Sequence, residues 1–239
     1  MEDSTKQTVS NLHKLVNSYT MPEKAKNLIG SGNVIVLCGV TASGKNTIAN
    51  YLVSHGNYRH VVSHTTRMPR ANHGVEEQNG KEYWFVSPQE LLEMVKNQEF
   101  VEVKAIHGET CYGTSIKAVE SVFAEGRLPV LEIDVQGALE FINAVPNLRP
   151  YFILPPSFDV WMERLGSRGN LTDIEKARRL SSAKMEIETV LANNSFIFIV
   201  NHEVDATAEE ITRGVDASLG SQAEYRKLAE ELLENIRSI

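Results

Sequence analysis

The sequence predicts an α/β protein in which a parallel sheet is covered by helices on both faces. Four short apolar runs, at 33–38, 128–134, 151–154 and 196–200, predict buried strands because each is β-branched or aromatic and is bounded by glycine, proline or a polar residue. Helical stretches separate these runs, and apolar strands that alternate with helices are typical of a parallel sheet. The 239 residues are 42% hydrophobic and 23% charged, which is ordinary for a globular protein.

Charge and cysteine content exclude several functional classes. Lysine and arginine number 24 against 31 acidic residues, a net charge of −7, which argues against a protein that coats nucleic acid. Two cysteines, Cys38 and Cys111, cannot form a disulfide framework. No signal sequence precedes the first apolar run, and that run is too short to span a bilayer. We expect a cytoplasmic protein without nucleic-acid or membrane partners, and the sequence leaves its oligomeric state open.

Capping signals and changes of pattern divide the chain. Ser87 with Glu90, and Thr172 with Glu175, have the spacing of capping boxes and predict helices that begin after them, the second reaching about residue 191. The segment from about 64 to 112 interrupts the alternation of strands and helices and looks like an insertion. We expect an N-terminal extension over 1–32, a main domain over 33–220 and an amphipathic C-terminal helix over 221–239.

The strongest local signal is the sequence GVTASGKN at 39–46, which follows the first strand and opens a helix expected over 47–53. Glycines let backbone N–H groups turn inward, a helix N-terminus favours an anion, and Lys45 supplies a charge for the β- and γ-phosphates. We interpret it as the phosphate loop of a P-loop NTPase-type fold, the alternative being a plain glycine-rich turn. The residue after the lysine is normally Ser or Thr and binds Mg²⁺. Asn46 stands there, and its side-chain oxygen can take that place, the alternatives being a metal held through a water molecule or mainly by the phosphates of the ligand.

Two further patterns point to anionic ligands and to metal. Arg67 and Arg70, held on either side of a proline, can clamp a phosphate with help from the Tyr83 hydroxyl, although a solvated basic turn is an equal alternative. Glu132 and Asp134 share one face at the end of an apolar strand. Carboxylates at this end of a parallel strand face Mg²⁺ or substrate, or else they form a structural ion pair.

The last pattern is a run of arginines that includes Arg164 and Arg168, followed by Arg178 and Arg179. Positive side chains in a glycine-containing segment suit a lid that closes over phosphoryl groups and excludes water. The alternative is a salt-bridged surface helix.

Taken in order, the motifs resemble those of guanylate kinases. After the phosphate loop come SHTTRxPR, GKEYxF, EFVE, YGTS, LEIDVQGA, PPS, RLxxRG and a final VN, which together cover about 33–214. The resemblance implies a three-layer core with a parallel sheet, an inserted GMP-binding subdomain at about 64–115 and a mobile lid at about 165–178. It also implies that the protein phosphorylates GMP, and with it dGMP, using ATP and Mg²⁺.

The resemblance assigns roles to individual residues. Those implied to read guanine are Ser63, Glu102, Thr114 and Asp134. Those implied to hold the GMP phosphate are Arg67, Arg70, Tyr83 and Tyr112. The implied catalytic cations are Lys45, Arg70, Arg168 and Arg179. The implied ATP-binding residues are Gly39, Val40, Thr41, Ala42, Ser43, Gly44, Lys45, Asn46, Thr47 and Asn201.

Two other functions remain open at this point. A non-catalytic interaction module with the same fold usually loses the loop glycines and lysine, and this chain keeps Gly39, Gly44 and Lys45. A kinase of another nucleoside monophosphate is disfavoured by the guanine-reading set. The chain departs from the family pattern at Asn46 and in the longer loop at 71–79.

Overall fold

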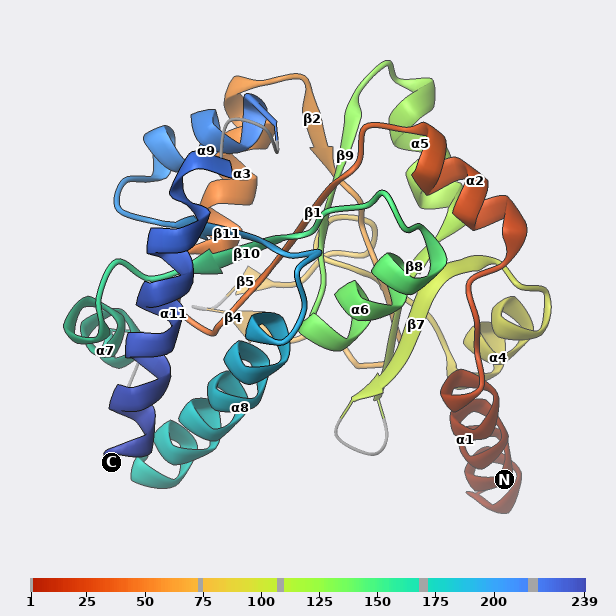
Figure 1. The fold of residues 1–239 in the computed structure, drawn as a ribbon. Coiled ribbons are helices and arrows are strands. Elements are labelled where there is room, and N and C mark those ends of the chain that lie inside the picture. Colours follow the sequence, from red (N-terminus) through yellow and green to blue (C-terminus); the bar gives the residue numbers. More distant parts are fainter. Residues whose placement is uncertain (1, 73–74, 107–109, 168–171, 215–218) are drawn as a thin grey trace. The chain divides into compact units, whose positions relative to one another are not determined.

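The computed structural model describes residues 2–72, 75–106, 110–167, 172–214 and 219–239 (Figure 1). The chain forms two compact units. The smaller unit contains the residues up to Val34 and Arg59–Pro129, and the larger contains Ile35–Tyr58 and Val130–Ile239.

A five-stranded sheet has the strand order β11-β10-β1-β9-β2, and its strands β11, β10 and β1 lie wholly in the larger unit. Its strands are β1 (Ile35–Gly39), β2 (Tyr58–His60), β9 (Leu128–Glu132), β10 (Tyr151–Leu154) and β11 (Ile197–Val200). The pairs β1–β9, β1–β10 and β10–β11 are parallel. The four predicted strands and the parallel sheet are therefore confirmed. The fifth strand, β2, was not predicted because its three residues are polar or aromatic and only partly buried.

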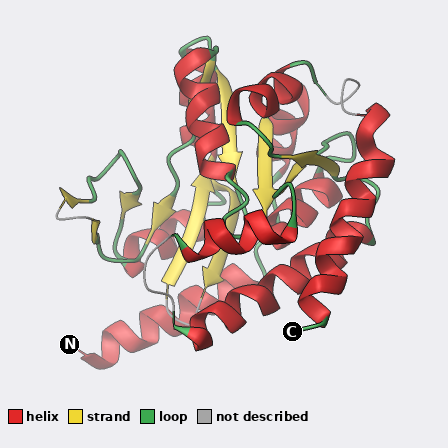
Figure 2. Cartoon of the chain, turned by 90° about the vertical axis from the view of Figure 1, so that its left-hand side faces the viewer, coloured by secondary structure: helices red, strands yellow, loops and turns green. Residues whose placement is uncertain are grey.

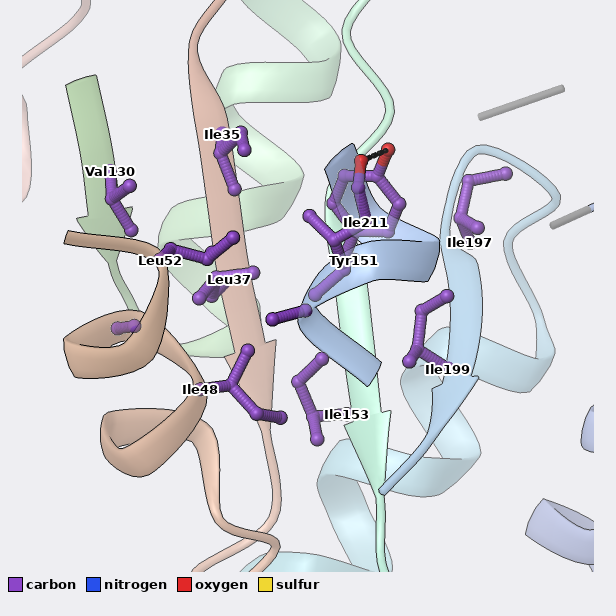
Figure 3. Close-up of a cluster of buried hydrophobic side chains, with 12 residues drawn as sticks. Ile35, Leu37, Ile48, Leu52, Val130, Tyr151, Ile153, Ile197, Ile199 and Ile211 are labelled. Carbon is purple, nitrogen blue, oxygen red and sulfur yellow. Dashed lines mark hydrogen bonds between the residues drawn. The ribbon is translucent and has the colours of Figure 1, made fainter. Parts of the chain in front are cut away.

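Helices cover both faces of this sheet, which makes three layers (Figure 2). On one face α3 (Lys45–His55) and α9 (Val204–Thr212) enclose a cluster of aliphatic side chains that includes Leu37, Ile153 and Ile199 (Figure 3). The intervening strand residues point to the other face, where the Phe198 ring meets the Arg226 guanidinium of α11 (Gln222–Arg237) at 5.5 Å. Beside α11 on that face lies α8 (Asp173–Leu191), which also packs against α6 (Val135–Ala144).

The smaller unit has a four-stranded sheet in the order β6-β3-β8-β7. Its strands are β3 (His64–Thr65), β6 (Trp84–Phe85), β7 (Phe100–Ile106) and β8 (Thr110–Ser115), and a separate hairpin joins β4 (Ala71–Asn72) to β5 (Val75–Glu76). Its helices are α1 (Glu2–Asn17), α2 (Glu23–Ser31), α4 (Pro88–Lys96) and α5 (Ile116–Ala124). The predicted capping box at Ser87 and Glu90 is confirmed in both of its hydrogen bonds, and α4 begins there.

Two boundary predictions need correction. The strand predicted over 128–134 ends at Glu132, and Asp134 is instead the N-cap of α6, where its Oδ1 accepts a 2.6 Å hydrogen bond from the Gly137 N–H. Glu132 and Asp134 therefore do not share one strand face. The helix after the phosphate loop begins at Lys45 rather than at residue 47.

The remaining elements are α7 (Phe158–Gly166) and a short 3₁₀ turn, Leu219–Ser221, before α11. Among the helices formed by the described residues, none combines the length and apolarity needed to cross a membrane.

Candidate functional site

The phosphate loop, residues 39–46, has a backbone that only glycine allows at two positions. Gly39 has a φ of 150°, and a Cβ there would lie 2.5 Å from the carbonyl oxygen of Ile153. Gly44 has a φ of 92°, and its Cβ would lie 2.1 Å from Nδ2 of Asn201. These conformations are forbidden or strained for residues with a side chain. The predicted strand–loop–helix arrangement is confirmed, and its glycines are needed for close approach rather than for a generic turn.

The protein holds this loop by its carbonyl oxygens. Trp161 Nε1, from α7, donates a 2.7 Å hydrogen bond to the carbonyl oxygen of Thr41. Asn201 Nδ2 donates a 2.8 Å bond to the carbonyl oxygen of Ser43, and Arg164 reaches the same oxygen at 3.5 Å and the Asn201 carbonyl at 3.2 Å. Anchoring through carbonyl groups fixes the loop while the N–H groups at the start of α3 remain suited to bind phosphate.

The predicted ATP-binding residues lie together in this loop and beside it. Val40, Ala42 and Ser43 are buried, Lys45 is half-buried, and Thr41, Asn46 and Thr47 are exposed. Asn201 is only 2% exposed. Its amide nitrogen donates a hydrogen bond to the Ser43 carbonyl oxygen, and its amide oxygen accepts one from the Thr207 hydroxyl. Asn201 thus holds the loop, and its contact with the ATP base stays a prediction.

The arginines that were predicted to form a lid do not share one environment. Arg179, on the first turns of α8, forms an ion pair of 2.6 Å with Glu175, which is the surface-helix alternative for the unliganded protein. Arg164 is drawn into the loop scaffold described above. Arg168 lies outside the described residues, as do three of its neighbours at 169–171.

A carboxyl group that sequence analysis did not single out lies near the phosphate-loop lysine. Burial raises the pKa of Glu186, on α8, to about 7, an effect that nearby Lys45 opposes and Asp134 reinforces. Its Oε2 is buried without a hydrogen-bond partner among the described residues. The sequence contained a sign that Glu186 is buried. Glu186 falls three residues after Ala183 and four before Val190, and both of these residues are on the buried face of α8.

In the smaller unit, three predicted guanine readers form a hydrogen-bonded row. Thr114 Oγ1, on β8, donates a 2.8 Å bond to Oε1 of Glu102 on β7, and Ser63 Oγ lies 3.2 Å from the same hydroxyl. Glu102 is 8% exposed and Thr114 is 1% exposed. A carboxylate fixed in this way presents a buried acceptor to a ligand that carries N–H donors. The fourth predicted reader, Asp134, belongs to the larger unit and caps α6.

The predicted phosphate-holding residues also gather in the smaller unit. The Arg67 guanidinium stacks 5.3 Å from the centre of the Tyr83 ring, and the Tyr83 and Tyr112 rings meet edge to face at 5.7 Å. The Arg70 side chain is exposed. Arg67, Tyr83 and Tyr112 are thus brought together as the motifs predicted.

Sequence analysis missed the carboxylate that completes this group. Glu77 binds the Arg67 guanidinium through two hydrogen bonds, of 2.8 and 3.0 Å, and accepts a third from the Arg70 N–H. The bond from Arg67 lowers the pKa of the Glu77 carboxyl. The pair is almost fully buried, with side chains 10% and 9% exposed. Its signal was the long loop at 71–79, which brings Glu77 back to the arginines.

The described residues contain no group of three or more His, Cys, Asp or Glu side chains placed to hold a metal ion. The donors at the phosphate loop suit Mg²⁺ in a different way. Asn46 is exposed at the start of α3, where a side-chain oxygen can serve as one hard ligand. Mg²⁺ commonly takes one or two protein ligands and completes its shell with water and substrate phosphates.

Comparisons with known proteins agree on one family. A family model described as Guanylate kinase matches residues 31–218. The guanylate kinase of Neisseria gonorrhoeae (strain ATCC 700825 / FA 1090) is 36% identical over 208 residues, which cover 85% of this chain and 97% of that protein. That of Bifidobacterium longum (strain NCC 2705) is 39% identical over 187 residues, covering 76% and 92%. The crystal structure of guanylate kinase from Anaplasma phagocytophilum matches with a TM-score of 0.56 and 29% identity, covering 87% of this chain and 97% of that one.

The Glu186 carboxyl predicts a pH-dependent stability. Its pKa is about 7 in the folded protein against 4.5 for the free group, so between these values the folded state binds the proton more tightly than the unfolded chain does. The free energy of unfolding therefore falls as pH rises, by about 3 kcal/mol in total. Glu186→Gln should remove this fall in the nucleotide-free protein, as measured by urea unfolding at pH 5, 6, 7 and 8.

The matched control is Glu163→Gln, which replaces an exposed carboxyl on α7 and should keep the wild-type pH dependence. If Glu186→Gln and wild type lose stability in parallel across this range, the Glu186 carboxyl is not the desolvated group described here.

Proposed function

The chain belongs to the guanylate kinase family and transfers a phosphoryl group from ATP to GMP, and we propose that two sets of its residues divide this work. The phosphate loop and Lys45 take ATP in the larger unit, and the Glu102 and Arg67 groups take GMP in the smaller unit. The observation that carries the proposal is the phosphate loop itself, whose two glycines lie where a side chain would collide with the scaffold. Membership of the family confirms the resemblance drawn from the motifs.

To catalyse phosphoryl transfer, a protein mainly has to position the two substrates and to compensate the negative charge of the phosphoryl group. The N–H groups at the start of α3 and the Lys45 ammonium would bind the β- and γ-phosphate oxygens, where negative charge is concentrated. Arg70, Arg168 and Arg179 are proposed to stabilise the group in transfer. Arg179 is paired with Glu175 on its own helix and only 29% exposed, so this role requires it to exchange that carboxylate for phosphate oxygens.

Guanine is recognised in this proposal by its N–H donors. The Glu102 carboxylate, already fixed by Thr114, would accept from the N1–H and the exocyclic amino group of guanine. Adenine does not offer this pair of donors and would leave the buried acceptor without a partner, which is the strongest form of discrimination available to a polar site. Asp134 is proposed as a second reader. The ribose is not part of this recognition, and we propose that dGMP is also a substrate.

The GMP phosphate would be held by Arg67, Arg70, Tyr83 and Tyr112. Because Glu77 already neutralises Arg67, the substrate phosphate meets an ion pair rather than a free cation. Arg67 has further N–H donors outside the fork that Glu77 uses, and the exposed Arg70 side chain supplies the uncompensated charge.

Mg²⁺ is the proposed cofactor, with Asn46 as its protein ligand through the side-chain oxygen. When bound, the ion would neutralise charge on the ATP phosphates. We further propose a cytoplasmic enzyme that uses small-molecule nucleotides and does not bind nucleic acid, which agrees with its net charge of −7. The proposed domain limits remain 33–220 for the kinase domain, with the GMP-binding subdomain at about 64–115 and the lid at about 165–178.

Removal of the phosphate-loop lysine tests the ATP half of the proposal. Lys45→Ala should lower kcat by at least about 10²–10³-fold, as the loss of one electrostatic stabiliser does elsewhere. A coupled assay of ADP release with ATP, Mg²⁺ and GMP measures it. Lys227→Ala, at an exposed position of α11, is the matched control and should retain wild-type turnover. Near-normal turnover of a folded Lys45→Ala protein would be incompatible with phosphoryl transfer at this loop.

Specificity tests the guanine readers. The wild-type enzyme should prefer GMP to AMP by about 10⁴–10⁵-fold in kcat/KM, and Glu102→Gln should narrow that gap because an amide offers one acceptor in place of two. Glu93→Gln, an exposed carboxylate of α4, should leave it unchanged. Comparable use of AMP by the wild type would show that Glu102 and Asp134 do not read the base.

Asn46 predicts weak binding of Mg²⁺, so that the enzyme needs more Mg²⁺ than a variant with serine at this position. Its side chain is one atom longer than that of serine, and Mg²⁺ tolerates little departure from octahedral geometry at about 2.0–2.1 Å. Asn46→Ser should therefore lower the Mg²⁺ concentration for half-maximal activity and tighten Mg²⁺-ATP binding in calorimetry, with unchanged affinity for GMP. Identical Mg²⁺ curves for the two proteins would mean that position 46 does not govern the metal.

A further inference from the structure

The segment before residue 31 lies outside the range that the family model matches, yet it makes specific contacts within the smaller unit. Leu12 and Val16 of α1 are 1% and 3% exposed and pack in one cluster with Leu91, Val95 and Phe100. Thr8 also meets Gln89 of α4 at 3.4 Å. Burial of two aliphatic side chains provides enough driving force to keep α1 in place. This segment is therefore part of the smaller unit rather than a loose extension.

Tyr19, which follows α1, bonds both backbone groups of a single residue on β7. Its hydroxyl donates a 2.7 Å hydrogen bond to the carbonyl oxygen of Phe100 and accepts a 3.1 Å bond from the Phe100 N–H. β7 is an edge strand of its sheet, so the outward N–H and C=O of Phe100 have no further strand to pair with. A tyrosine hydroxyl, which is both donor and acceptor, takes the place of that strand at one position.

The bonded residue stands beside an irregularity that decides the direction of Glu102. Phe100 is opposite Ser115, but Glu102 is opposite Thr114, so β7 contains one extra residue, Val101, relative to β8. Side chains alternate between the faces of a strand, and one extra residue exchanges the faces of everything beyond it. Without this bulge, Val101 would stand opposite Thr114 and Glu102 would point away from it.

The bulge is held from two sides. Gly113, on β8, has no side chain, and a Cβ there would lie 2.8 Å from the Phe100 ring and 2.9 Å from the Glu102 carbonyl oxygen. On the outer side the Tyr19 hydroxyl fixes the Phe100 backbone. Burial raises the pKa of the Tyr19 phenol, the hydrogen bond to the Phe100 backbone opposes this, and the nearby Glu99 and Glu102 carboxylates add to it. The edge of β7 thus cannot shift by one residue without breaking both bonds to Tyr19.

We propose that Tyr19 is a positioning residue for guanine recognition: it locks the bulge of β7 and so keeps the Glu102 carboxylate beside Thr114. The inference rests on the proposed role of Glu102 in reading guanine. It gives the N-terminal segment a part in substrate specificity, exerted through the backbone of Phe100 and without contact between Tyr19 and substrate.

The test compares Tyr19→Phe, which removes only the hydroxyl, with the wild type. Calorimetric dissociation constants are measured for GMP and for IMP, which lacks the exocyclic amino group. Tyr19→Phe should weaken GMP binding on the order of 10-fold, with a smaller effect on IMP, since one net hydrogen bond to guanine is lost or misaligned. The affinity for ATP should stay within about twofold, because that site is built from other residues. Hydrogen exchange of the Phe100 amide should become faster.

Ser87→Ala is the control for a general loss of stability in the smaller unit. It removes the N-cap of α4 and should lower the thermal stability of the protein without changing the preference for GMP over IMP. If Tyr19→Phe behaves like Ser87→Ala, with lower thermal stability and an unchanged preference, Tyr19 is merely structural and the proposal is overturned.

Glu102→Gln distinguishes failure of the role of Tyr19 from failure of the proposed role of Glu102 in reading guanine. If it lowers the preference for GMP over IMP while Tyr19→Phe leaves that preference intact, only the role of Tyr19 is refuted. If the preference survives Glu102→Gln as well, Glu102 does not read guanine, and the proposed recognition fails together with the inference built on it. Loss of preference in both variants supports both.

Discussion

The larger unit is organised by one constraint: a turn of backbone must stay rigid while its N–H groups remain available to a ligand. A rigid loop needs internal hydrogen bonds, but bonds made by the N–H groups would consume the donors that phosphate requires. The structure meets both needs because side chains bind the loop through its carbonyl oxygens. Trp161 donates a hydrogen bond to the carbonyl oxygen of Thr41, and Asn201 donates one to the carbonyl oxygen of Ser43. Gly44 is glycine because Asn201 must come this close. These two donors come from α7, which carries Trp161, and from the end of β11, which Asn201 follows.

A second regularity is that the cations proposed to bind phosphate have a carboxyl group nearby. Arg67 is paired with Glu77 in the smaller unit, and Lys45 acts on the pKa of Glu186 in the larger one. An uncompensated buried charge costs several kcal/mol, so the Glu77 carboxylate stabilises the buried Arg67 guanidinium. The two solutions differ. Glu77 is a charged partner in a fork of hydrogen bonds, whereas burial favours the neutral form of Glu186, which limits how strongly it can compete with phosphate for Lys45.

The sequence predicted what is determined locally and left out what depends on distant partners. The four apolar strands, the phosphate loop and the caps at Ser87 and Thr172 are short-range patterns, and the structure contains all of them. β2 was missed because three polar and aromatic residues carry no hydrophobic period. Asp134 was placed on a strand because period 2 continues for one step past the true end of β9, where an Asp also serves well as an N-cap. Glu77 and Glu186 left signals, the long loop at 71–79 and the buried face of α8, but neither signal names the partner of the carboxyl group. Tyr19 could not be assigned at all, because Tyr19 and Phe100 are 81 residues apart in the chain.

The smaller unit shows why such a distant contact can matter for chemistry. A side chain on a regular strand would be fixed by the register of the whole sheet, but Glu102, the proposed guanine reader, lies just after a bulge, where the ladder is interrupted and the strand is at an edge. Both features weaken the usual determination of which face a side chain takes. Additional restraint has to come from outside the ladder, and the structure supplies it through Thr114 at the carboxylate and Tyr19 at the backbone. Because α1 is anchored in the same apolar cluster as the Phe100 ring, the packing of α1 and the position of Phe100 beside the bulge depend on one set of contacts.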